Sequence, residues 1–149
     1  MSCLLAFPRY RLEDRRYPPR VSIDGPGSAG EQRRLRFLVV DDSEDIRDVM
    51  SRMIEMLGHE VEEAADGQYA VEALQRSTFD VMLLDLSMPR MTGEEVVRWI
   101  RDNPPYGENM RIVVVSAWSG SQRPVLNELG VTEVLPKPFR RQQLIDLLS

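Results

Sequence analysis

Residues 79–89 read Phe79-Asp80-Val81-Met82-Leu83-Leu84-Asp85-Leu86-Ser87-Met88-Pro89, so four apolar residues lead directly to an aspartate. The run Val81–Leu84 is typical of a short strand that is buried on both faces of a sheet. Asp85 follows this run, at the point where the strand is expected to end. Because ligands bind at the carboxyl ends of strands in an open α/β sheet, the sequence predicts that Asp85 lies in a functional site.

Similar apolar runs recur on both sides of this stretch and alternate with segments of helical spacing. The predicted strands are residues 37–40, 59–65, 81–84, 112–115 and 133–135. The predicted helices begin near residues 44, 67, 94 and 124, and a last helix holds Leu144, Ile145, Leu147 and Leu148. A strand followed by a helix, repeated five times, predicts one parallel α/β sheet with helices on both faces and right-handed crossovers.

The first predicted helix has the clearest periodicity in the chain. Its apolar face is expected to hold Ile46, Val49, Met50, Met53, Ile54 and Leu57. Ser43 stands at the position of an N-terminal cap, and Gly58 at the position of a C-terminal cap. His59, the only histidine, follows this glycine in a turn, so metal sites built on histidine and Ser-His-Asp triads are not expected.

Charge is distributed unevenly along the 149 residues, of which 42% are hydrophobic and 29% charged. Residues 1–36 carry a net charge of +4, which leaves −9 for residues 37–149, since the whole chain carries −5. We therefore predict a basic, disordered N-terminal extension over residues 1–35 and one domain over residues 36–149. The acidic domain argues against direct contact with nucleic acid.

With one cysteine, Cys3, and no apolar run long enough to span a membrane, a cytoplasmic protein is expected.

Polar residues follow four of the predicted strands, and all of these strand ends lie at one edge of a parallel sheet. They are Asp41 and Asp42, then Asp85, Ser116 and Lys137, in the order of the chain. Three carboxylates at one edge repel one another, and their hard oxygens favour Mg²⁺ as the cation that relieves the repulsion. The sequence therefore predicts a magnesium site beside Asp85, with a lysine and a hydroxyl group near it.

Over residues 36–149 the chain resembles the receiver domain of bacterial response regulators. The resemblance rests on Asp41-Asp42, on Asp85 followed by Met88-Pro89 and Gly93, on Ser116-Ala117, and on Lys137-Pro138-Phe139. It implies a flavodoxin-like (CheY-like) doubly wound fold with the strand order 2-1-3-4-5. It also implies a cis Lys137–Pro138 bond.

The same resemblance implies a role for each site residue. Asp85 is expected to accept a phosphoryl group from a sensor histidine kinase, with Ser116 as the hydroxyl switch and Lys137 as the phosphate-contacting cation. Asp42 and Asp85 would bind Mg²⁺ directly, and Asp41 would hold a metal-bound water. The backbone carbonyl of Ser87 would complete the metal site.

These roles predict a stand-alone, single-domain response regulator of a phosphorelay, which is not classed as an enzyme. It would act on a downstream target protein or pass the phosphoryl group to a histidine phosphotransfer protein, as a monomer or as a phosphorylation-dependent dimer. The alternative is a constitutive interaction module that keeps the receiver fold without phosphorylation.

Two residues bear on how the switch works. Val134 stands where the family often has a tyrosine or phenylalanine, three residues before the lysine, so the output step is expected to be unusual. Trp118, two residues after Ser116, is expected either to shield the site or to lie at its rim.

Two other classes of protein with this architecture fit the sequence less well. An aspartate-nucleophile phosphatase places its nucleophile after the first strand as Asp-x-Asp, whereas this chain has Asp41-Asp42-Ser43 and no insertion for a cap. A flavin or dinucleotide binder is disfavoured because no Gly-x-Gly-x-x-Gly motif follows the first strand, where acidic residues would repel phosphate.

Overall fold

The computed structural model of the chain describes residues 33–117 and 123–148. Strands and helices alternate in the order β1 (Arg36–Val40), α1 (Glu44–Met56), β2 (Glu60–Ala64), α2 (Gly67–Arg76), β3 (Val81–Leu84), α3 (Gly93–Asp102), the 3-10 helix η3 (Pro104–Tyr106), β4 (Arg111–Ser116), α4 (Arg123–Glu128), β5 (Glu133–Pro136) and α5 (Arg141–Leu148). This order confirms the predicted alternation of strands and helices.

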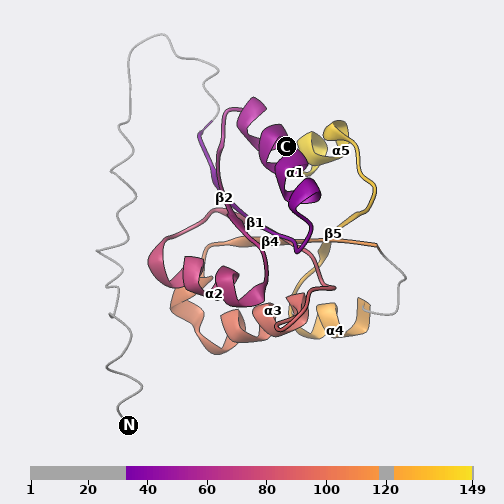
Figure 1. Cartoon of the computed structure of the whole chain (residues 1–149). Coiled ribbons are helices and arrows are strands. Elements are labelled where there is room, and N and C mark those ends of the chain that lie inside the picture. Colours follow the sequence, from indigo (N-terminus) through magenta and orange to yellow (C-terminus); the bar gives the residue numbers. More distant parts are fainter. Residues whose placement is uncertain (1–32, 118–122, 149) are drawn as a thin grey trace. The chain divides into compact units, whose positions relative to one another are not determined.

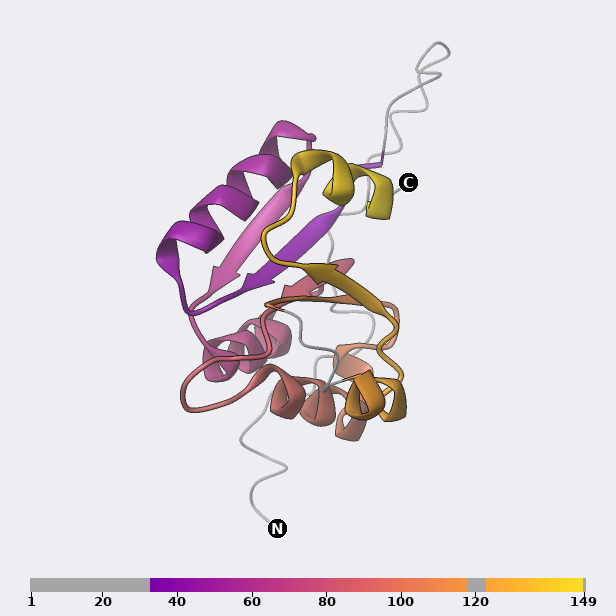
Figure 2. The same ribbon diagram turned by 90° about the vertical axis from the view of Figure 1, so that its right-hand side faces the viewer.

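Within the described residues, the strands form one sheet in the order β2-β1-β3-β4-β5, and every neighbouring pair is parallel. Helices α1 and α5 cover one face of this sheet, and α2, α3 and α4 cover the other (Figures 1 and 2). The predicted flavodoxin-like strand order and two-sided layering are therefore confirmed. All five strands run in the same direction, so their carboxyl ends share one edge.

Each central strand contributes alternate side chains to two separate cores. Phe37 and Val39 pack with Met50 and Ile54 of α1, whereas Leu38 and Val40 face the core beneath α2, α3 and α4. The side chains of β3 divide between the same two cores. Burying one such aliphatic side chain stabilises the fold by about 1.5–3 kcal/mol, so the two cores fix the position of the strand ends tightly.

Helix α1 agrees with its predicted bounds but not with every predicted contact. Val49 was expected on the buried face, yet it is 50% exposed, because the buried stripe is narrower than helical spacing indicates. Ser43 occupies the N-cap position without a side-chain hydrogen bond to the helix. Gly58 has a φ of +87°, and this left-handed turn ends the helix as predicted.

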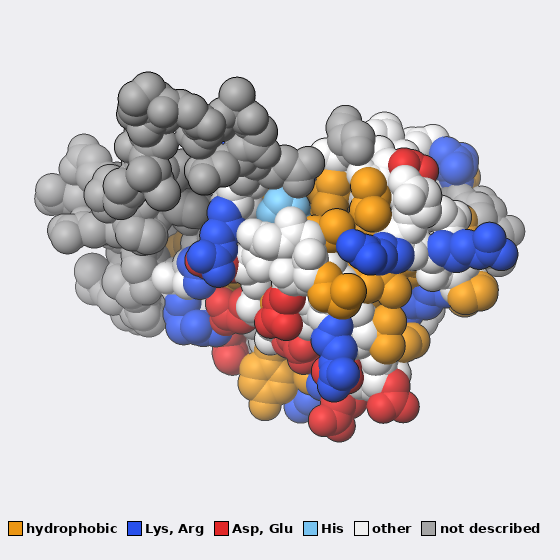
Figure 3. Space-filling model, turned by 90° about the horizontal axis from the view of Figure 1, so that it is seen from above, with side chains coloured by type: hydrophobic (Ala, Val, Ile, Leu, Met, Phe, Trp, Pro, Cys, Tyr) orange, Lys and Arg blue, Asp and Glu red, His pale blue; other side chains and the backbone are white. Residues whose placement is uncertain are grey.

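The surface on the side of α1 and α5 carries hydrophobic side chains between charged ones (Figure 3). No helix among the described residues is both long enough and apolar enough to cross a membrane. The described residues from Arg34 onward form one compact unit. The predicted N-terminal extension lies almost wholly outside the described residues, as does Trp118, so both of these expectations stay predictions.

Candidate functional site

Three carboxylates converge where β1 and β3 end. The backbone N–H of Asp85 donates to the carbonyl of Val40 at 2.9 Å, and that of Asp41 donates to the carbonyl of Ala64 at 3.2 Å. These bonds extend the parallel pairing one residue beyond the strands and hold Asp41 beside Asp85. Asp42 joins them, so oxygens of Asp41, Asp42 and Asp85 all lie within 4.8 Å of one another. The predicted acidic cluster is therefore present.

Asp41 is the most firmly held member of this cluster. Its side chain is 1% exposed, and one oxygen accepts a hydrogen bond from the backbone N–H of Ser43 at 2.9 Å. Its other oxygen accepts from the Lys137 ammonium group at 2.5 Å. Both oxygens of this buried carboxylate are thus satisfied, as burial of a charged group requires.

Asp85 is also buried, with a residue exposure of 5%. Its Oδ1 lies 3.6 Å from the Lys137 ammonium nitrogen and accepts from the backbone N–H of Ser87 at 3.4 Å. Burial raises the pKa of Asp85 above its ordinary value, the nearby Lys137 ammonium opposes this rise, and the Asp41 carboxylate adds to it. A cation at this position would favour the ionised form of Asp85.

The donor set suits a hard divalent cation. Carboxylate oxygens are the ligands that Mg²⁺ prefers, and an exposed Asp42 beside two buried aspartates leaves one side of the cluster open to water. Mg²⁺ generally keeps several water ligands, which such an open side permits. These three residues therefore fit a magnesium ion.

Ser116 is the last residue of β4, and Lys137 follows the neighbouring strand β5. The backbone N–H of Lys137 donates to the carbonyl of Ser116 at 2.9 Å, which ties the end of β4 to the residue after β5. Ser116 is 2% exposed. The Lys137–Pro138 peptide bond is cis, as the resemblance implies. Lys137 thus reaches the acidic cluster, while the role of the Ser116 hydroxyl stays a prediction.

The loop after β3 is fixed by contacts that sequence analysis did not identify. Arg90, at a left-handed φ of +67°, forms an ion pair with the buried carboxylate of Asp66, which also accepts from the N–H of Tyr69 and so caps α2. A Cβ on Gly93 would lie 2.3 Å from the carbonyl oxygen of Asp85. Only glycine therefore lets α3 begin this close to Asp85.

Two residues that the sequence singled out lie away from the acidic cluster. Val134 is partly buried and packs against the core beneath α2, α3 and α4. His59 lies at the opposite edge of the sheet, where its Nδ1 accepts from the backbone N–H of Leu35 at 3.2 Å. Burial lowers the pKa of His59, and its ring packs against Phe37. These contacts give His59 a structural role.

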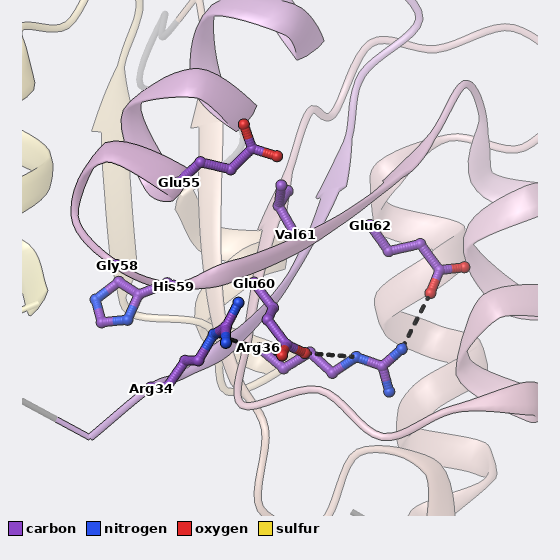
Figure 4. A pocket seen from close by; sticks show the side chains of 8 residues that line it. All are labelled: Arg34, Arg36, Glu55, Gly58, His59, Glu60, Val61 and Glu62. Carbon is purple, nitrogen blue, oxygen red and sulfur yellow. Dashed lines mark ion pairs between the residues drawn. The ribbon is translucent and has the colours of Figure 1, made fainter.

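A hollow of about 720 Å³ lies at the amino-terminal end of β1 and β2 and is lined in part by Arg34, Arg36, Glu60 and Glu62 (Figure 4). Glu60 lies within ion-pair distance of Arg34 and Arg36, at 3.4 and 4.0 Å, and Arg36 also pairs with Glu62 at 3.6 Å. The lining also includes Glu55, so three glutamates stand against two arginines, and Glu60 and Glu62 are already engaged in ion pairs with the arginines. The hollow therefore offers a ligand only a small net charge.

Comparison with known proteins adds to this geometry. The family model described as the response regulator receiver domain matches residues 37–149. The response regulator MprA of Mycobacterium leprae is 37% identical over 112 residues, which cover 74% of this chain and 48% of that protein. The chain thus spans about half the length of the curated relatives that it matches.

Solved structures show the same fold. The chemotaxis protein CheY4 of Vibrio cholerae has 35% identity and a TM-score of 0.72, over 78% of this chain and 97% of that one. The receiver domain of the sensor histidine kinase PA1611 of Pseudomonas aeruginosa has 29% identity and a TM-score of 0.70, over 78% and 95% of the two chains. That structure has a magnesium ion coordinated in its active site cleft.

Proposed function

Because the chain belongs to the response regulator receiver domain family, we propose that Asp85 accepts a phosphoryl group from a sensor histidine kinase. Membership of this family implies phosphorylation-based two-component signalling, and receiver domains act mainly as signalling switches. One observation carries the assignment to Asp85. Its carboxylate is buried at the end of a central strand, 3.6 Å from Lys137 and within 4.8 Å of the other two acids.

Asp85 and the residues around it have different roles in phosphoryl transfer. Asp85 attacks the phosphorus atom, and the bond between phosphorus and the histidine nitrogen of the kinase breaks as the new O–P bond forms. Asp85 must therefore be ionised, and Lys137 favours that state by lowering the pKa that burial raises. Once Asp85 is phosphorylated, the Lys137 ammonium can neutralise a phosphoryl oxygen, and the hydroxyl of Ser116 donates a hydrogen bond to another.

We assign the metal site to the same cluster. Asp42, Asp85 and the backbone carbonyl of Ser87 would bind Mg²⁺, and Asp41 would hold a metal-bound water. A bound Mg²⁺ would supply charge neutralisation between the carboxylates and the incoming phosphoryl group. The carboxylate donors support this assignment, and so does the magnesium ion in the PA1611 receiver domain.

Output would follow from the phosphorylated state, through altered contacts with a target protein or through transfer to a histidine phosphotransfer protein. The expectation that the protein has no nucleic-acid partner finds no support in the comparisons and stays a prediction. Phosphorylation-dependent dimerisation is likewise a proposal. The alternative, a constitutive interaction module, is not favoured by membership of a signalling family.

Intact mass spectrometry after incubation with Mg²⁺ and acetyl phosphate tests the proposal. The wild-type protein should gain the mass of one phosphoryl group, and Asp85→Asn should gain none. Asp80→Asn is a matched control, because Asp80 precedes β3 whereas Asp85 follows it, and this variant should be labelled like the wild type. Labelling of Asp85→Asn would refute the assignment, and no labelling of the wild type would favour the constitutive module.

A further inference from the structure

Arg47 of α1 has an unusual environment for an arginine near the start of a helix. Its side chain is only 13% exposed, and one guanidinium nitrogen donates to the backbone carbonyl of Asp41 at 2.7 Å. Its Nε lies 3.4 Å from a carboxylate oxygen of Glu63 on β2, without hydrogen-bond geometry. Burying a guanidinium group costs free energy, and an apolar side chain could fill the same space at less cost.

Glu63 is itself held from the next turn of α1. The hydroxyl of Ser51, which is 6% exposed, donates to Glu63 at 2.6 Å. Ser51, Glu63 and Arg47 therefore form a continuous set of contacts that runs from α1 to β2 and back to Asp41. The guanidinium group is thus held between the Asp41 carbonyl and the Glu63 carboxylate. These two contacts fix the direction from which it donates to the carbonyl of Asp41.

The carbonyl of Asp41 belongs to the peptide bond that joins Asp41 to Asp42. The carboxylate of Asp41 is fixed independently, by Ser43 and Lys137. Asp42 is exposed, and among the described residues no hydrogen bond or ion pair holds its side chain. The direction of the Asp42 side chain is therefore set by its backbone, and Arg47 is the side chain that fixes the preceding peptide plane.

We propose that Arg47 is a positioning residue for the acidic cluster: it orients the Asp41–Asp42 peptide so that the Asp42 carboxylate faces the cation shared with Asp85. This inference rests on the proposed function, since it assumes that the cluster binds Mg²⁺. Glu63 balances the charge of Arg47, so the main effect of Arg47 is on placement of a ligand. A second set of contacts, from β2 through α1, thus reaches the site from the side opposite Lys137.

Isothermal titration calorimetry with Mg²⁺ tests this role without relying on phosphorylation. Arg47→Met should raise the Kd for Mg²⁺ by about ten-fold or more, as loss of a residue that orients a metal ligand commonly does. Arg52→Met is the matched control on the same helix, because Arg52 is 72% exposed and its ion pair within the described part of the chain is with Asp48. It should leave the Kd within about two-fold of wild type. Asp42→Ala serves as the variant that lacks the ligand itself.

Thermal unfolding without Mg²⁺ separates positioning from stability. A purely structural role would lower the unfolding temperature of Arg47→Met and leave the Kd unchanged, and that result would overturn the inference. If Arg47→Met does not fold, Glu63→Gln loosens the guanidinium group from the exposed side and should still raise the Kd, whereas an unchanged Kd would overturn the inference. Absence of Mg²⁺ binding in wild type would refute the metal site as well, so the two failures are distinguishable.

Discussion

Charged side chains lie both at the edge of the sheet where the strands begin and at the edge where they end. Ion pairs balance these charges to different extents at the two edges. At the amino-terminal edge, Arg34 and Arg36 pair with Glu60 and Glu62 in exposed or half-exposed contacts (Figure 4). At the carboxyl-terminal edge, Lys137 makes the only ion pairs that the described residues form with the three clustered carboxylates. Two of those carboxylates are buried, so water only weakly screens the excess negative charge of three carboxylates beside one lysine.

The hollow and the proposed functional site therefore lie at different edges of the sheet. The amino-terminal edge has a hollow of about 720 Å³, yet both of its arginines already form ion pairs with Glu60 or Glu62 in the wall. The carboxyl-terminal edge has a cluster of three carboxylates whose charge Lys137 compensates only in part, and a bound cation would compensate the rest. An exposed ion pair contributes at most about 1 kcal/mol, whereas a buried charge without compensation is strongly destabilising.

The largest expected effect comes from removing the positive charge of Lys137 at the carboxyl-terminal edge. Lys137→Met should slow phosphorylation by acetyl phosphate by about 100-fold, because one preorganised charge that stabilises the transferring group is lost. Arg34→Met removes a 68% exposed cation at the other edge and should leave the rate unchanged. Time courses of labelling by mass spectrometry measure both rates. Equal rates in the two variants would remove the functional distinction between the edges.

Replacing one glycine at each edge by alanine is expected to have a smaller effect than Lys137→Met. Gly93→Ala should lower the free energy of unfolding by about 1–3 kcal/mol, because the added Cβ would overlap the backbone of Asp85 and Leu86. Gly58→Ala should cost about 1 kcal/mol, since no atom lies within 4 Å and only the left-handed φ of +87° opposes it. Only Gly93→Ala should also slow phosphorylation. Urea denaturation and labelling rates would show this, and impaired labelling of Gly58→Ala would contradict it.

The smallest expected effects concern pH, and they have opposite signs at the two edges. Burial raises the pKa of Asp85, so stability that the protonated form provides is lost as pH rises from 3.8 through the folded-state pKa. Asp85→Asn should therefore gain stability relative to wild type as pH increases.

At the other edge, burial lowers the pKa of His59, so stability is lost as pH falls from 6.5 through the folded-state pKa. His59→Asn should therefore gain stability relative to wild type as pH decreases. Urea denaturation without Mg²⁺ between about pH 4.5 and 7.5 measures both trends. A common sign for the two variants would show that burial is not the main cause of both shifts.

The sequence predicted the fold and the clustering of charged residues because both follow from local patterns. Apolar runs such as Val81–Leu84 identify buried strands, and parallel strands bring their ends to one edge. Asp85 and Lys137 lie 52 positions apart, yet each follows a predicted strand, and the shared edge of a parallel sheet predicted that they lie near each other.

The contacts that hold the site could not be predicted in the same way. Arg47 looks like any polar residue of an amphipathic helix, and only the packing of α1 on β2 brings it to the carbonyl of Asp41. The ion pair between Arg90 and Asp66 likewise depends on a left-handed backbone at Arg90, which no local pattern indicates. Helical spacing placed Val49 on the apolar face but gave no measure of the width that is buried.

The most direct test of the central claim locates the phosphoryl group within the chain. The protein would be treated with Mg²⁺ and acetyl phosphate, reduced with borohydride, which converts an aspartyl phosphate to homoserine, and mapped by peptide mass spectrometry. We expect homoserine at Asp85 alone, with Asp41 and Asp42 unmodified. Homoserine at either of those residues, or a stable phosphoryl group on a serine or on His59, would contradict the assignment of Asp85 as the acceptor.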